Sequence, residues 1–116
     1  MKLPPKIQNQ LTQFEQVRQQ LQLLTTQRIQ IDSQLRELAN ALEELEKSGK
    51  SAVIYKRVGT ILVKVDNKKD LKGQMTEQKE TFDVRMKTLE RQEKQLKERY
   101  SELQKEISKA VQEFEK

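Results

Sequence analysis

Apolar side chains recur over residues 7–47 at steps of three and four, the spacing of one face of an α-helix. From Val17 onward the steps alternate four and three, with Arg28 in one slot, as in the heptad seam of a coiled coil. Nearer the N-terminus, Leu11, Phe14 and Val17 are joined by two successive steps of three. Such a stammer predicts less regular packing at that end of the helix.

A second row with the same spacing runs over residues 71–115 and predicts a second helix of similar length. Two polar residues, Gln78 and Glu93, occupy slots in this row. Asp70 is the predicted N-cap, because a short carboxylate there can accept hydrogen bonds from the backbone N–H groups of the first turn. Gly49 is the predicted left-handed cap that ends the first helix.

Between the helices, residues 52–66 are rich in β-branched side chains, and Gly59-Thr60 divides them into two short runs. This pattern predicts a tight β-hairpin that turns near Gly59. Large apolar side chains alternate onto both faces of this hairpin. They are Val53, Ile54, Tyr55, Val58, Ile61, Leu62, Val63 and Val65.

The hairpin reverses the chain, so the two helices are predicted to pack as an antiparallel coiled coil with both termini at the far tip. The predicted fold class is therefore mainly α, and residues 1–116 are interpreted as a single unit. A lone hairpin is marginal in water and leaves two edges unpaired. We therefore predict that hairpins of several subunits pair through these residues and Gly59 into a shared sheet or barrel. Coverage of the hairpin by its own helices is the alternative.

Composition narrows the function. The chain is 34% hydrophobic and 35% charged, which is typical of long helices rather than of a thick globular core. It has no Cys and no His, which excludes thiol nucleophiles and the common zinc sites. No Gly-rich phosphate loop is present either. We expect no enzymatic activity, no catalytic residues, no metal and no cofactor. With no membrane-length apolar stretch and no signal-like N-terminus, a cytoplasmic location is expected.

Charge leaves a second function open. Residues 51–70 carry five basic and two acidic side chains, whereas both helical segments are nearly balanced. A nucleic-acid-binding arm would use the basic cluster Lys56, Arg57, Lys64, Lys68 and Lys69. A purely structural coiled-coil arm is a further alternative. The acidic pairs Glu43-Glu44 and Glu90–Glu93 are interpreted as solvated helix faces, because catalysis or metal binding needs a concave site.

Apolar residues near both chain ends are candidates for binding other proteins. If the helices are antiparallel, these residues meet at one tip, where helix ends fray readily. The candidates are Leu3, Ile7, Leu11, Phe14, Ile107, Val111 and Phe114. The alternative is that they simply close the end of the coiled coil.

The hairpin sequence Ala-Val-Ile-Tyr-Lys-Arg-Val-Gly-Thr-Ile-Leu-Val-Lys-Val (52–65) and the helical run 85–93 resemble the archaeal-type β-class prefoldin subunits. One hairpin rather than two indicates the β class rather than the α class. The resemblance implies a hetero-hexamer of two α-type and four β-type subunits, with hairpins in a barrel and coiled coils as tentacles. It also implies an ATP-independent chaperone that binds non-native client proteins at the tips and passes them to a group II chaperonin. Neither nucleic acid nor a membrane is an implied partner.

Overall fold

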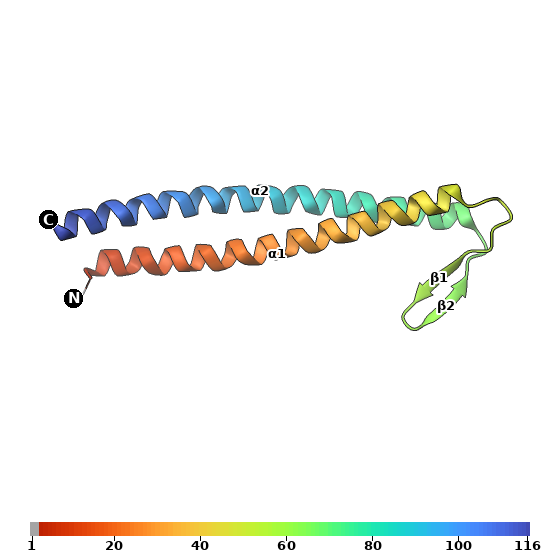
Figure 1. Ribbon diagram of the computed structural model, residues 1–116, viewed down its shortest axis with the longest axis horizontal. Helices are drawn as coiled ribbons and strands as arrows, with labels where there is room; N and C mark the ends of the chain where they lie inside the picture. The colour runs from red at the N-terminus through yellow and green to blue at the C-terminus, as the bar shows by residue number, and fades with distance from the viewer. Residues whose placement is uncertain (1–2) are drawn as a thin grey trace. The chain divides into compact units, whose positions relative to one another are not determined.

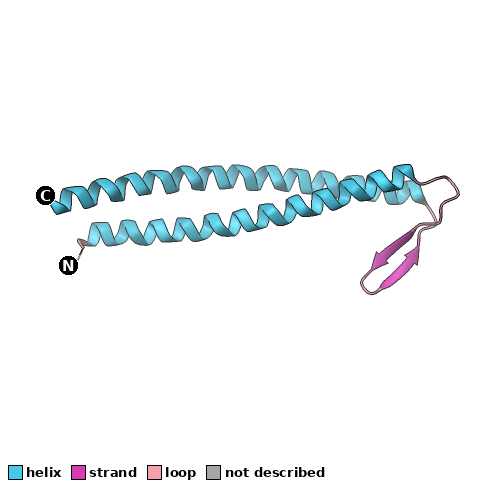
Figure 2. Ribbon diagram, viewed as in Figure 1, coloured by secondary structure: helices cyan, strands magenta, loops and turns pink. Residues whose placement is uncertain are grey.

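The computed structural model describes residues 3–116 as two helices joined by one hairpin (Figures 1 and 2). The elements are α1 (Pro5–Lys47), β1 (Tyr55–Val58), β2 (Ile61–Lys64) and α2 (Lys68–Glu115). The chain divides into two compact units. The tip unit comprises residues up to 30 together with 87–116, and the hairpin unit comprises residues 31–86. The mainly α fold class with a short antiparallel hairpin is confirmed.

The N-terminus of α1 includes a proline, although the apolar pattern predicts a helix that starts at residue 7. Pro5 occupies the first helical position, and the backbone N–H of Gln8 donates to the Pro4 carbonyl at 3.1 Å. Proline is well suited there, because its missing N–H would have no partner inside the helix. The helix therefore begins two residues earlier than the apolar pattern indicated.

Both predicted caps around the hairpin are wrong. Gly49 does not have a positive φ, and α1 ends instead with the Ser48 hydroxyl donating to the Leu45 carbonyl at 2.6 Å. At the start of α2, Asn67 rather than Asp70 is the cap. Its Oδ1 accepts hydrogen bonds from the backbone N–H groups of Lys69 at 3.0 Å and Asp70 at 3.2 Å. An amide oxygen at this position satisfies two first-turn donors at once.

The hairpin has a tight two-residue loop. Val58 pairs with Ile61, and the register continues to Tyr55 and Lys64. Gly59 has φ of 61°, and no other described residue has a positive φ. A two-residue loop with positive φ only at its first central residue is a type II′ turn, in which glycine is favoured at that position.

In the tip unit the helices run antiparallel, since Phe14 of α1 lies against Tyr100 of α2 and Arg28 lies against Glu93. The inward-facing positions of α1 keep a regular heptad down to Ile7, with Gln10 half-buried and Leu11 exposed. The predicted stammer is therefore absent, because Gln10 and not Leu11 occupies the seam. Leu103 is the most completely buried side chain among the described residues.

In the hairpin unit the seam of α1 ends at the buried Leu45. On α2, Lys79 is half-buried and Gln78 is exposed, so the seam passes one residue later than expected. Two polar contacts join the helix ends beside the hairpin. Lys72 forms an ion pair with Glu46, and the Lys68 ammonium donates to the Ser48 carbonyl at 2.8 Å. These contacts hold the two helix ends together where the hairpin leaves them.

Candidate interaction surfaces

The two faces of the hairpin differ in chemistry. Residues paired across an antiparallel ladder point to the same side, and side chains alternate along each strand. We call one side the apolar face, where Lys56 is the single charge. Its members are Ile54, Lys56, Val58, Ile61, Val63 and Val65. We call the other the mixed face, formed by Tyr55, Arg57, Leu62 and Lys64. The sequence indicated two apolar faces, but the register makes one of them partly cationic.

Every residue of β1 and β2 is exposed. The exposed fraction of the large apolar side chains in the strands runs from 45% at Val63 to 68% at Leu62. The alternative in which the helices cover the strands is therefore wrong for this chain. Apolar side chains on both sides of a ribbon one layer thick form a surface that a soluble protein ordinarily covers with a partner.

Both backbone edges of the hairpin are also unpaired within the described chain. The Val65 N–H donates to the Ile54 carbonyl at 2.8 Å, which fixes the alternation of hydrogen-bonded pairs in the ladder. Tyr55 and Arg57 consequently direct their N–H and C=O groups outward on β1, and Leu62 and Lys64 do so on β2. Each edge can accept a further strand.

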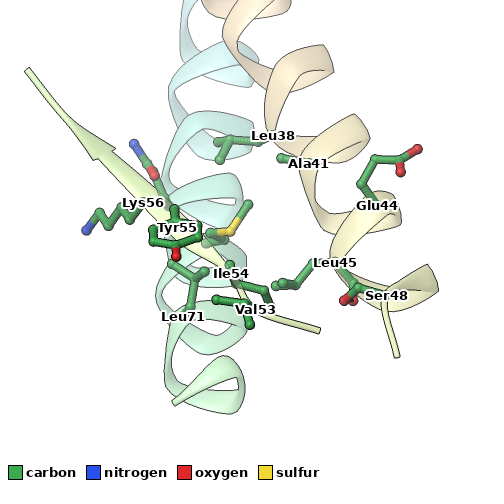
Figure 3. Close-up of a pocket in the computed structure, with 12 residues that line it drawn as sticks. Leu38, Ala41, Glu44, Leu45, Ser48, Val53, Ile54, Tyr55, Lys56 and Leu71 are labelled. Atoms are coloured by element: carbon green, nitrogen blue, oxygen red, sulfur yellow. Dashed lines mark hydrogen bonds between the residues drawn. The ribbon is translucent and has the colours of Figure 1, made fainter. Parts of the chain in front are cut away.

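An apolar pocket of about 540 Å³ lies at the root of the hairpin within the hairpin unit. Val53 and Ile54 face Leu45 of α1 and Leu71 of α2 across it, while Lys56 and Glu44 point away (Figure 3). Sequence reasoning missed the pocket, because the apolar spacing does not reveal that Ala41, a small side chain, also lines it.

The seven tip candidates all lie in the tip unit but differ in how far solvent reaches them. Ile7 is only 3% exposed and belongs to the core. Leu3, Phe14, Ile107 and Val111 are half-buried. Leu11 and Phe114 are the most accessible, at 40% and 38%. The tip is thus closed by some of these side chains and offers others to solvent.

Leu11 faces solvent because the adjacent polar residue, Gln10, occupies the position that faces the partner helix. Gln10 occupies an inward position, and its side-chain oxygen is buried without a hydrogen-bond partner among the described residues. A buried unpaired carbonyl costs about 1–3 kcal/mol. One turn further along, Phe14 and Tyr100 pack with ring centroids 4.5 Å apart. The end of the tip is therefore weaker than the aromatic layer behind it.

A charged layer interrupts the seam further along the tip unit. The Arg28 guanidinium donates to the Glu93 carboxylate at 2.6 Å, and Lys97 lies 3.1 Å from its other oxygen. Glu93 is 4% exposed, so the expectation that it lies on a solvated face is wrong. The hydrogen bond from Arg28 lowers the pKa of Glu93, burial opposes this effect, and Lys97 adds to it. Arg28 occupies a seam position of α1 and Glu93 a seam position of α2, and the two positions lie opposite each other in one layer of the coiled coil.

Replacing Glu93 with Gln should lower the free energy of unfolding by about 1 kcal/mol at neutral pH. A hydrogen bond to a charged group contributes about 1.5–3 kcal/mol, and the one-third exposure of Arg28 reduces that figure. Because the pKa of Glu93 is lowered by folding, the stabilisation is complete above the unfolded-state pKa of about 4.3 and disappears as pH falls below it. Urea titrations at neutral and acidic pH, at one protein concentration, measure both effects.

Glu90→Gln is the matched control for this prediction, because Glu90 is exposed on the same helix. It should change stability little at either pH. Equal losses for the Glu90 and Glu93 variants would show that the Arg28 contact does not stabilise the arm.

Within residues 3–116, His, Cys, Asp and Glu side chains form no group of three or more that could hold a metal ion. The helices of this part of the chain also include none that is long and apolar enough to cross a membrane. The surfaces that these residues do form are the exposed hairpin, the pocket at its root and the partly open tip.

These features define a class of protein in which a helical arm carries an exposed, unpaired β-hairpin. The sequence profile of the family described as "Prefoldin subunit" matches residues 8–114. A "Prefoldin subunit beta" from Archaeoglobus fulgidus is 48% identical over 105 residues, covering 90% of each chain. Another from Thermococcus onnurineus is 45% identical over 109 residues, covering 94% of this chain and 93% of that one.

A solved structure agrees with the sequence relatives. The crystal structure of the prefoldin beta subunit from Thermococcus strain KS-1 superposes with a TM-score of 0.82 at 41% identity, covering 94% of this chain and 95% of that one. The chain belongs to the prefoldin subunit family and to its β class. Membership supports a chaperone-type role, and members of this family form heteromeric complexes with other prefoldin subunits.

Proposed function

We propose that this chain is a subunit of an ATP-independent chaperone that binds unfolded proteins at its coiled-coil tips and delivers them to a group II chaperonin. The observation that carries the proposal is the coexistence of two exposed apolar surfaces, the hairpin and the tip, in a β-class prefoldin chain. One surface suits assembly and the other suits capture. The protein is cytoplasmic in this proposal and works without cofactor or enzymatic chemistry.

The hairpin is the proposed assembly element. Pairing with hairpins of α-type and further β-type subunits would satisfy both free edges and bury the apolar face. The proposed complex contains two α-type and four β-type subunits around a β-barrel platform. The residues assigned to assembly are Val53, Ile54, Tyr55, Val58, Gly59, Ile61, Leu62, Val63 and Val65.

The tip is the proposed client-binding site. Leu11 and Phe114 are accessible in the closed arm, and Leu3, Phe14, Ile107 and Val111 are half-buried beside them. Ile7 would join the surface only when the tip opens. Several arms that each offer a few weak apolar contacts would hold one client by avidity.

The two alternatives predict different behaviour. A nucleic-acid-binding arm would lose affinity steeply with salt, whereas capture through apolar contacts would not. A purely structural arm would hold no client under any condition. Three of the basic residues, Lys56, Arg57 and Lys64, lie on strands proposed to be inside an assembly, which disfavours the nucleic-acid function.

The complex of this chain with an α-type prefoldin subunit should suppress the aggregation of a chemically denatured reporter protein without ATP. Light scattering after dilution of the reporter measures this directly. Adding ATP and magnesium should leave protection unchanged, because the proposal includes no nucleotide-driven step. An unrelated soluble coiled coil at equal mass serves as control. Loss of protection on adding ATP, in the absence of chaperonin, would contradict the proposal.

A further inference from the structure

We infer that the cations of the hairpin strands, Lys56, Arg57 and Lys64, select an acidic strand of a different subunit over a second copy of this chain. The inference rests on the proposed function of the hairpin as the assembly element.

The strands contain three cations and no acidic residue. All three cations are exposed, and none of them forms an ion pair within the described chain. Arg57 donates a hydrogen bond to the Gly59 carbonyl at 3.2 Å, which holds its guanidinium near the turn. The hairpin thus presents positive charge that its own chain leaves uncompensated.

Two of these cations occupy the positions at which a new strand would pair. Arg57 directs its backbone groups outward from β1, and Lys64 does so from β2. A residue placed opposite either one on an added strand would have its Cβ atom about 4.5–5.5 Å away. The stability of strand pairing at each edge of the hairpin therefore depends on the charge of the neighbouring strand.

A second copy of this chain is the less favourable neighbour at these two edges. The only charged residues that its strands bring to a new ladder are Lys and Arg, and like charges opposite each other are destabilising. A strand that carries Asp or Glu at these positions gains a favourable pair instead. The apolar face supplies the attraction common to both partners, and the charges decide which partner is preferred.

The surroundings of the cations favour a protein partner over nucleic acid. Lys56 lies among the apolar side chains Val58 and Val63. Arg57 and Lys64 lie on different strands, and Leu62, on the same face, is opposite Arg57 and two residues from Lys64. Binding to a phosphate backbone would leave these apolar groups in water. A hairpin partner covers the apolar groups and pairs the cations together.

The test uses a variant with reversed charges, Lys56→Glu/Arg57→Glu/Lys64→Glu, as the acidic partner of the wild-type chain. Sedimentation at low salt compares each chain alone with their equimolar mixture. The mixture should associate about tenfold more tightly than either chain alone, since each opposite-charge pair contributes about 0.2–1 kcal/mol and each like-charge pair opposes association. The preference should disappear near 1 M NaCl, where screening extends over only about 3 Å.

A control variant, Lys87→Glu/Lys105→Glu/Lys109→Glu, has the same net charge but exposed substitutions on α2. Mixed with wild type, it should show no preference. Equal association of the acidic-hairpin mixture and the separate chains would overturn the inference. Binding of a DNA duplex by the wild type, together with such equality, would assign the cations to nucleic acid and overturn it too.

Failure of this inference is distinguishable from failure of the assembly proposal. The contribution of apolar burial to association through the hairpin is tested by Ile61→Asp/Val63→Asp. If that variant disrupts association while charge reversal gives no preference, the hairpin assembles but its cations do not choose the partner. If that variant associates normally, the hairpin is not the assembly element and the inference falls with it.

Discussion

The double substitution Ile61→Asp/Val63→Asp is expected to reduce the assembled complex to free chains while leaving the helical signal nearly unchanged. Both residues lie on the apolar face, where the assembly proposal buries them. Losing the burial of two such side chains costs about 1.5–3 kcal/mol each, and burying unpaired carboxylates costs more. The loss recurs at every hairpin interface. Sedimentation velocity measures the mass, and far-ultraviolet circular dichroism measures the helices.

A matched control separates this site from general surface effects. Leu23 and Ile29 of α1 are exposed to nearly the same degree as Ile61 but lie outside the hairpin. The variant Leu23→Asp/Ile29→Asp should therefore leave the complex intact. A complex that survives charges at Ile61 and Val63, or that dissociates equally in the control, would refute the assignment of the hairpin.

The overall fold could be predicted from the sequence because its signals are long and repeated. More than ten apolar positions mark each helix, so one misplaced residue hardly alters the pattern. The hairpin is marked independently by β-branched residues around Gly59. Gly59 also supplies the positive φ that the turn requires. These signals agree with one another, which is what specifies a single structure.

The details that could not be predicted depend on which of two nearby residues occupies one structural position, such as a helix cap or a seam position. Asn67 caps α2 although Asp70 is an equally good cap by type, because the chain leaves β2 in a conformation that aligns Asn67 with the first turn. Glu93 resembles a solvated acid until Arg28 is found beside it, 65 residues away in sequence. The apolar spacing places Arg28 and Glu93 in seam slots of their own helices, but it cannot report that these two slots meet in one layer and form an ion pair.

The seam near the tip is the most informative of these failures. The apolar spacing predicts Leu11 in the seam, yet the regular heptad places the neighbouring Gln10 there. Adjacent residues point about 100° apart around a helix, so the residue nearer the seam is covered more than its neighbour. The continuous heptad behind this position decides the competition in favour of Gln10. The result is a buried unpaired amide oxygen next to an exposed leucine.

This arrangement leads to a prediction about capture. Exchanging the two residues, as Gln10→Leu/Leu11→Gln, should raise the free energy of unfolding of the arm by about 1–3 kcal/mol, because it buries a leucine and removes the unpaired carbonyl. It should also weaken protection of a denatured client. Each arm would lose an accessible apolar side chain, and its tip would open less readily. Because several arms act together, about tenfold more complex should be needed for half-maximal protection.

The exchange conserves composition, so a change in client protection reports position alone. Exchanging Gln22 and Leu23, which are both exposed on α1, is the matched control and should alter neither stability nor protection. Light scattering from a diluted, denatured reporter measures protection, and sedimentation verifies that both variants assemble. If the exchange at positions 10 and 11 stabilises the arm but protection stays at the wild-type level, clients bind elsewhere. The apolar pocket at the root of the hairpin would then be the next surface to test, because Leu38, Leu45 and Met75 provide there the apolar contacts that the tip would not be supplying.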